Sequence, residues 1–168
     1  MSVPPADTGS QAARVREIVA DHRDERGALL PILHSVLTEF GCVPKSVIPV
    51  IAQELNLSRA DVHGVASFYR DFRNEPAGRT TVRICRAEAC QSVGANDLAA
   101  SAEQQYGVKM GQTSANGDIT LDEVFCLGNC ALGPSAQIAG TTYGRVTPHR
   151  LAELVDAAAH SQVEVGQP

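Results

Sequence analysis

The chain has 168 residues, of which 43% are hydrophobic and 20% charged, the composition of a soluble globular protein of one or two domains. Its formal net charge of −5 argues against nucleic acid as a partner, because phosphate binding requires clustered lysine and arginine. No run of about 18 apolar residues is present, so we expect no membrane span.

Residues 1–11 carry proline, serine and glycine, but neither the basic nor the apolar stretch of a secretion signal. We therefore expect a disordered leader, and a protein of the reducing cytoplasm, where structural disulfides are rare. The cysteine count of five, an odd number, also fits a disulfide framework poorly. Metal binding or redox chemistry is the better interpretation of these cysteines.

Helical patterns fill residues 12–75, which we expect to form a helical domain. A short amphipathic turn comes first, and a strong helix pattern follows. The apolar residues of that pattern recur at helical spacing, namely Leu29, Leu33, Val36 and Phe40. Gly41 should end this helix, and Ser58 with Asp61 should cap a later one.

Three aromatic residues stand near the end of the helical half: Phe68, Tyr69 and Phe72. They either contact a partner protein or fill the bundle core, and the sequence leaves both readings open. Cys42 is interpreted as a small buried residue and not as a reactive thiol. His63 is interpreted as a helix-surface or core histidine and not as a proton relay.

A turn at residues 75–78 marks the expected domain boundary, and residues 79–160 change character beyond it. Strand and helix patterns follow there in the order β-α-β-β-α, which indicates a small α/β layer and an α+β fold class for the whole chain. The expected elements are strands at 80–85 and 119–125, a hairpin around Gly140, and helices at 98–106 and from Pro148 onward. We expect a loose tail over residues 161–168.

Four of the five cysteines form two close pairs, each after a strand pattern. Cys85 and Cys90 have the spacing C-x4-C, and Cys126 and Cys130 have the spacing C-x3-C. Four thiolates form a soft anionic ligand set, which suits a tetrahedral metal ion or an iron–sulfur cluster. Structural zinc usually takes tighter C-x2-C pairs, and a thioredoxin-type dithiol requires C-x-x-C, which is absent. A [2Fe–2S] cluster is therefore favoured, while zinc and unpaired thiols stay open.

Small residues surround both pairs and would let the main chain approach sulfur atoms closely. Gly128 and Gly133 lie beside the second pair, and backbone N–H donors there would help to set a cluster's reduction potential. Arg86, next to the first pair, either offsets cluster charge or is a solvated surface residue. No glycine-rich phosphate loop or paired-carboxylate site is present, and Asp122-Glu123 is expected to be an exposed strand end.

The cysteine segments and two helical stretches together resemble the [2Fe–2S] subunit family of respiratory complex I, the 24-kDa type. The resemblance is carried by residues 85–92 (CRAEACQS), 126–135 (CLGNCALGPS), 27–34 (GALLPILH) and 57–69 (LSRADVHGVASFY). A closer resemblance is to the gamma subunit of soluble, molybdenum-containing, NAD-dependent formate dehydrogenases. Complex I members usually have Ala-Pro after the last cysteine, whereas this chain has Leu132-Gly133-Pro134. A subunit of an NAD-reducing hydrogenase is a further alternative.

The resemblance implies an N-terminal helical bundle followed by a thioredoxin-like domain with one [2Fe–2S] cluster. Its ligands would be Cys85, Cys90, Cys126 and Cys130, one pair for each iron. A partner subunit would carry FMN and bind NAD(H), and a second partner would carry the molybdenum cofactor where formate is oxidised. The chain itself would transfer electrons without catalysing the reaction. A zinc-stabilised scaffold module is the alternative of a different class.

Overall fold

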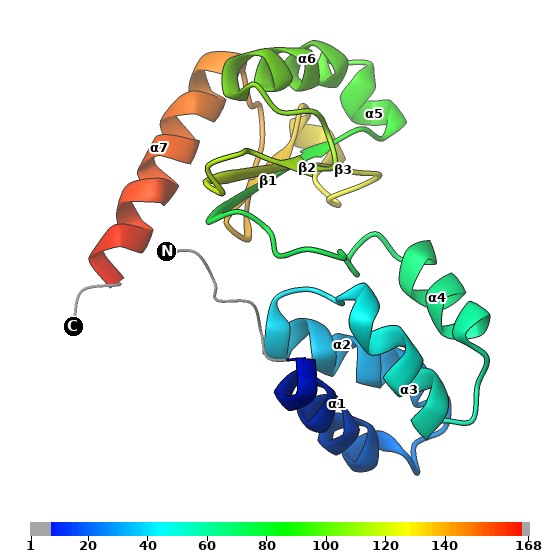
Figure 1. Ribbon diagram of the computed structural model, residues 1–168. Coiled ribbons are helices and arrows are strands. Elements are labelled where there is room, and N and C mark those ends of the chain that lie inside the picture. Colours follow the sequence, from blue (N-terminus) through cyan, green and yellow to red (C-terminus); the bar gives the residue numbers. More distant parts are fainter. Residues whose placement is uncertain (1–7, 166–168) are drawn as a thin grey trace. The chain divides into compact units, whose positions relative to one another are not determined.

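The computed structural model describes residues 8–165 (Figure 1) and the side chains of residues 9–160. The chain divides into two compact units, Met1–Pro76 and Ala77–Pro168, each with a hydrophobic core of its own. Among the described residues, no helix combines the length and the apolar character needed to cross a membrane.

The first unit consists of helices joined by short turns. Its elements are α1 (Thr8–His22), α2 (Leu29–Phe40), the 3-10 helix η1 (Lys45–Val47), α3 (Ile48–Glu54) and α4 (Arg59–Phe68). Their apolar faces meet in one core, whose most deeply buried members include Val15, Ile32, Leu33, Val36, Ile51 and Val62. A group of packed helices is therefore observed where the apolar spacing predicts one.

Two predicted helix ends are confirmed. Gly41 has a φ of 70°, the left-handed conformation that favours glycine, and its N–H donates to the Leu37 carbonyl at the end of α2. Ser58 and Asp61 form a capping box at the start of α4, in which the Asp61 N–H donates to the Ser58 Oγ at 3.0 Å.

Helix α1 begins at Thr8, so the expectation of a disordered leader over residues 1–11 is wrong for its last four residues. The preceding residues 1–7 lie outside the described part of the chain. Val15 and Ile18 are buried in the core and anchor this helix. Once a helix is nucleated, each further residue adds a hydrogen bond, so α1 extends into a polar sequence that has no apolar pattern.

The aromatic residues at the end of the helical unit divide between core and surface. Phe72 is 5% exposed and packs in the core, with its ring 5.0 Å from the ring of His34. Phe68 and Tyr69 are exposed by 78% and 43%, and their rings meet edge to face. The core reading is therefore correct for Phe72 and wrong for the other two residues.

The second unit is a sheet packed against helices (Figure 1). Its elements are β1 (Thr80–Cys85), α5 (Glu88–Gln91), α6 (Ala95–Tyr106), β2 (Gln112–Thr113), β3 (Ile119–Val124), the 3-10 helix η2 (Cys130–Leu132), β4 (Ala136–Ile138), β5 (Thr141–Tyr143) and α7 (Pro148–Val165). Within the described residues the strand order is β2-β3-β1-β4-β5. Strands β1 and β3 are parallel, and all other neighbours are antiparallel. The predicted α+β class is confirmed.

Strand β1 lies at the centre of the sheet and alternates its side chains between the two faces. Val82 and Ile84 share a core with Leu98 of α6 and Leu151 of α7, so both helices cover the same face. Cys85 follows Ile84 and packs in a separate small cluster of buried residues. The strand thus directs the first cysteine away from the main core.

Three features of the second unit differ from the sequence-based expectation. Helix α7 runs to Val165, so the expectation of a loose tail over residues 161–168 is wrong for residues 161–165. Residues 166–168 lie outside the described part of the chain. No glycine or proline interrupts the helix before Gly166. The two-residue β2 and the short α5 and η2 were not predicted, because such short elements carry no periodic pattern. Strand β3 ends one residue earlier than expected, at Val124.

Candidate metal centre

The sheet brings the two cysteine segments to one edge. Strand β1 ends at Cys85 and β3 ends at Val124, and the parallel register pairs these two residues. Parallel neighbours end on the same side of a sheet, so the loops that follow β1 and β3 start next to each other. The Arg86 N–H donates to the Val124 carbonyl at 2.7 Å and joins the two loop starts.

The first pair is buried. Cys85 and Cys90 are each 1% exposed and pack with Ala95 and the partly buried Ala87 and Val124. Burial and then contact with Cys85 raise the pKa of the Cys90 thiol, whereas the amide and the hydroxyl of Ser135 act to lower this pKa. The first pair therefore offers sulfur atoms in contact with each other and largely shielded from water.

The second pair is exposed, with the Sγ atoms of Cys126 and Cys130 3.8 Å apart. The pKa of Cys130 is raised first by its hydrogen bond with Cys126 and by the charge of Cys126, then by burial, and then by the charges of Cys90 and Cys85. Cys130 is therefore within electrostatic reach of the other three thiols. All five cysteines of the chain are free thiols.

The four cysteines form two pairs and not one closely converged group. Within residues 8–165, no three side chains of His, Cys, Asp or Glu are arranged as ligands of a single metal ion.

The backbone after β3 turns sharply so that an amide meets the first exposed sulfur. Cys126 has a φ of 150°, and Gly128 has a φ of 75°, which favours glycine. The Gly128 N–H donates to the Cys126 Sγ at 3.3 Å. A backbone donor beside a thiolate sulfur stabilises negative charge there, as the small residues of this loop led us to expect.

Gly133 provides the second close approach expected from the sequence. A Cβ at this position would lie 2.8 Å from the Val93 Cγ2 and 3.5 Å from the Cys90 Sγ. Since real Cβ atoms essentially never approach another heavy atom within 3.0 Å, a larger residue here would require the Val93 side chain to move. The main chain of the second segment therefore packs directly on the sulfur of the first.

Ser135 is a residue of this region that the sequence analysis did not single out. It is 1% exposed, and its carbonyl accepts the Cys85 N–H at 3.0 Å. Its hydroxyl donates toward the carbonyls of Asn129 and Leu132, at 3.2 and 3.4 Å. The sequence feature that could have indicated this residue is its position, since a lone serine comes between Pro134 and the apolar strand β4.

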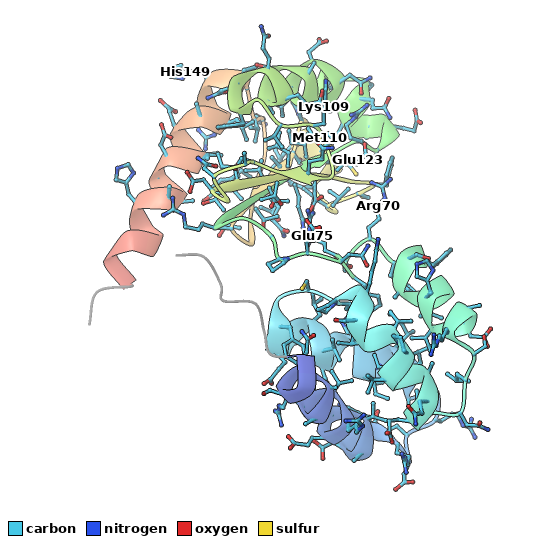
Figure 2. All side chains as sticks on the ribbon, viewed as in Figure 1. Arg70, Glu75, Lys109, Met110, Glu123 and His149 are labelled. Carbon is cyan, nitrogen blue, oxygen red and sulfur yellow. The ribbon has the colours of Figure 1, made fainter. Side chains whose placement is uncertain are left out.

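Arg86 and Glu123 lie beside the cysteines and interact with each other. The Arg86 Nη1 is 3.7 Å from the Glu123 Oε2, and the two side chains are 29% and 25% exposed. Arg86 is therefore not a fully solvated residue. Glu123, labelled in Figure 2, is half-buried, so the expectation of an exposed strand end at this residue is wrong. The carboxylate gains the cation as a neighbour, which explains why it tolerates partial burial.

Two other candidates take no part in this region. Cys42 is 4% exposed and belongs to the first unit, where burial raises the pKa of its thiol; this fits the reading of a small buried residue. His63 is exposed on α4 of the same unit, as the surface reading predicts.

The residues at this edge of the sheet fit an iron–sulfur cluster. The donor set consists of four cysteine sulfurs in two pairs, the set that such clusters take from proteins. A backbone amide donates to one sulfur, and the Gly133 backbone lies beside another. Both features favour a group that carries negative charge on sulfur.

Comparison with known proteins agrees with this chemistry. The family described as thioredoxin-like [2Fe-2S] ferredoxin matches residues 15–159. One of the subunits of the NADH-quinone oxidoreductase of Pseudomonas aeruginosa is 37% identical over 136 residues, which make up 81% of this chain and 82% of that protein. The HndA subunit of the NADP-reducing hydrogenase of Solidesulfovibrio fructosivorans is 30% identical over 131 residues, 78% of this chain and 77% of that protein.

A solved structure shares the fold. The NAD+-reducing [NiFe]-hydrogenase in its air-oxidised state contains a region that matches 83% of this chain with a TM-score of 0.64 and 19% identity. This chain spans 24% of the length of that hydrogenase chain. The family match over nearly the whole chain and the two relatives confirm the resemblance that the cysteine segments predict. The chain belongs to the thioredoxin-like [2Fe–2S] ferredoxin family.

Proposed function

We propose that this chain is the electron-transfer subunit of an NAD(H)-linked oxidoreductase complex of the cytoplasm, with one [2Fe–2S] cluster held by Cys85, Cys90, Cys126 and Cys130. When bound, such a cluster accepts and releases a single electron. One observation carries the proposal: a buried and an exposed thiol pair follow two parallel strands at the same edge of the sheet. Membership of the [2Fe–2S] ferredoxin family supports it.

The two pairs have different tasks in this proposal. Cys85 and Cys90 supply sulfur atoms from which water is excluded. Cys126 and Cys130 supply sulfur atoms at the surface, where the redox group of a partner protein can come close. The Gly128 amide, which donates to the Cys126 Sγ, stabilises the negative charge on the exposed side.

Nicotinamide and flavin chemistry belong to a partner subunit. The sequence of this chain has no glycine-rich phosphate loop, so the proposal assigns FMN and the NAD(H) site to a neighbouring protein. The names of the relatives support this context, because one is a subunit of an NADH-quinone oxidoreductase and another is a subunit of an NADP-reducing hydrogenase. In this role the chain is not itself a catalyst.

Within this class, our proposal favours the formate dehydrogenase branch, with a further subunit that carries the molybdenum cofactor. Its support is the Leu132-Gly133-Pro134 step, which replaces the Ala-Pro usual in complex I members. Complex I and hydrogenase are the competing contexts, since the relatives compared above belong to those two kinds of complex. Affinity purification of the chain with its native partners separates the three contexts. Molybdenum and formate-dependent reduction of NAD+ are expected, and a complex active only with hydrogen or with quinone would contradict the formate assignment.

The electron-transfer role is tested on the same purified complex by electron paramagnetic resonance. Addition of NADH should produce the signal of a reduced [2Fe–2S] cluster from wild type, and this signal should be lost or altered in the Cys126→Ser variant. The difference between the spectra of wild type and variant separates the signal of this chain from that of any other cluster in the complex. Identical spectra, or one bound zinc ion in the isolated wild-type chain, would favour the scaffold alternative instead.

A further inference from the structure

Ser135 occupies a junction between the two cysteine segments. Its carbonyl accepts the N–H of Cys85, in the first segment, at 3.0 Å. Its Oγ lies 3.2 Å from the Asn129 carbonyl and 3.4 Å from the Leu132 carbonyl, on the turn that contains Cys130. With 1% of its surface exposed, the residue makes these contacts without competition from water. The backbone carbonyl and the side chain of Ser135 together therefore connect the buried pair to the turn of the exposed pair.

The orientation of the hydroxyl is restricted by a neighbouring amide. The Asn129 Nδ2 donates to the Ser135 Oγ at 3.3 Å, so the hydroxyl oxygen already accepts one hydrogen bond. In this structure its single proton is directed to one of two carbonyls, those of Asn129 and Leu132. The Cys90 sulfur lies close to this segment, because a Cβ on Gly133, two residues before Ser135, would be 3.5 Å from the Cys90 Sγ. The amide and the hydroxyl of Ser135 act to lower the pKa of the Cys90 thiol.

The turn that Ser135 holds is also packed from its other side. The Arg145 N–H donates to the Leu132 carbonyl at 2.7 Å. A Cβ on Gly144 would lie 2.6 Å from the Leu132 Cβ and 2.9 Å from the Asn129 Nδ2, so the segment after β5 lies directly against the turn. The turn is therefore enclosed between Gly144 and Ser135, and its position responds to a change in either residue.

We infer that Ser135 is a positioning residue for the electron-transfer site, whose hydroxyl fixes the Cys130 turn against the buried cysteine pair and donates to Cys90 sulfur in the reduced state. This inference rests on the proposed function, because it requires a cluster on the four cysteines. Reduction by one electron from dithionite adds one negative charge at the sulfurs. A hydroxyl donor next to sulfur therefore favours the reduced state and raises the reduction potential.

The test compares four purified chains with their iron–sulfur content intact: wild type, Ser135→Ala, Ser135→Thr and Ser92→Ala. Threonine keeps the hydroxyl. Ser92 is a matched control, because its exposed hydroxyl, two residues after Cys90, donates only to the Ala89 carbonyl at 2.9 Å. Reduction potentials are measured by dithionite titration followed by electron paramagnetic resonance, and cluster loss is followed as the decay of visible absorbance in the presence of a chelator.

We expect the oxidised-to-reduced ratio of the Ser135→Ala variant at a given potential to rise about tenfold, a shift of about 59 mV to more negative potential. Its cluster should also be lost faster than that of wild type. Ser135→Thr should stay close to wild type, and Ser92→Ala should equal it. If Ser135→Ala holds no cluster, Asn129→Ala replaces it, since it removes the donor that orients the hydroxyl and should shift the potential in the same direction.

The result that overturns the inference is a Ser135→Ala protein, or in its place an Asn129→Ala protein, with the potential and the decay rate of wild type. A potential in Ser135→Thr as negative as in Ser135→Ala would also overturn it, because the hydroxyl would then be irrelevant. Wild type without iron and sulfide would instead refute the proposed function, so the two failures are distinguishable.

Discussion

Cys85 and Cys90 are each 1% exposed, whereas Cys126 and Cys130 lie at the surface of the same sheet edge. The first pair is held by the end of a strand and by α5, among buried apolar residues. The second pair stands in a loop whose first cysteine has a φ of 150° and whose second begins the 3-10 helix η2. The two cysteine pairs have the same chemistry, but one lies among buried apolar residues and the other lies in an exposed loop.

The difference indicates how one site combines retention with access. Buried thiols are shielded from water and from competing reagents, but they keep the redox group of another protein at a greater distance. Exposed thiols give such access, and their loop depends on backbone contacts such as the Gly128 amide to keep its shape. The buried pair thus retains the cluster in our proposal, and the exposed pair faces the partner.

The largest expected effect is on iron content, and it should differ between the two cysteine pairs when one cysteine of each pair is replaced by serine. Cys85→Ser should lower the iron content of the purified chain roughly tenfold or more, because a buried serine must ionise without water. Cys126→Ser should keep a larger share of iron with an altered spectrum, since its exposed oxygen is solvated and its loop can adjust. Iron and acid-labile sulfide analysis measures both.

Cys42→Ala is the control for these variants, because this buried thiol belongs to the first unit and is expected to leave the iron content unchanged. Equal iron loss in Cys85→Ser and Cys126→Ser would remove the distinction between a retaining and an accessible pair.

Chemical labelling of the chain after removal of iron gives the second prediction. Iodoacetamide should modify Cys126 and Cys130 at least about tenfold faster than Cys85 and Cys90, because buried thiols react only after local opening of the structure. Peptide mass spectrometry over a time course measures the rates, with the buried Cys42 as an internal reference. Uniform labelling of all five cysteines, in a chain that retains its helical circular dichroism, would show that burial of the first pair depends on bound iron.

Close packing between the two segments gives the third prediction. Gly133→Ala should destabilise the protein by about 1–3 kcal/mol, because the new Cβ would meet the Val93 Cγ2 at 2.8 Å. Gly64→Ala is the matched control: Gly64 lies within α4 with open space around its Cβ position, so alanine should stabilise by about 0.5–1 kcal/mol. Thermal and urea unfolding measure both, and a neutral Gly133→Ala would mean that Val93 moves freely.

The smallest expected effect concerns the amide on the exposed sulfur. Gly128→Ala and Gly140→Ala both place alanine at a positive φ, 75° and 85°, with open space around the Cβ, so each should cost about 1 kcal/mol of stability. Only Gly128 donates to sulfur, so only its substitution should make the reduction potential more negative. A shift of the potential in Gly140→Ala of the same size would assign the effect to general loosening of the fold.

Local chemistry explains what could be predicted from the sequence. The end of α2 at Gly41 and the capping box of Ser58 and Asp61 depend on neighbouring residues only, so their patterns are visible in the chain. The two cysteine pairs stand out for the same reason, because the first begins at the last residue of a strand and the second begins two residues after a strand.

The remaining features depend on tertiary contacts. The junction at Ser135 joins residues from the two cysteine segments, and no periodic pattern indicates a buried hydroxyl. The half-burial of Glu123 follows from its pairing with Arg86, 37 residues earlier, which strand register decides. Helices α1 and α7 extend beyond their apolar patterns because helix propagation needs no burial once the core has anchored one turn.

The most direct test of the four-cysteine cluster is the metal and sulfide content of the wild-type chain purified without oxygen, combined with its paramagnetic resonance after reduction. We predict about two iron atoms and two acid-labile sulfides for each chain, and the signal of a single reduced [2Fe–2S] cluster. One zinc ion for each chain, no sulfide and no signal would contradict an electron-transfer role for the paired cysteines.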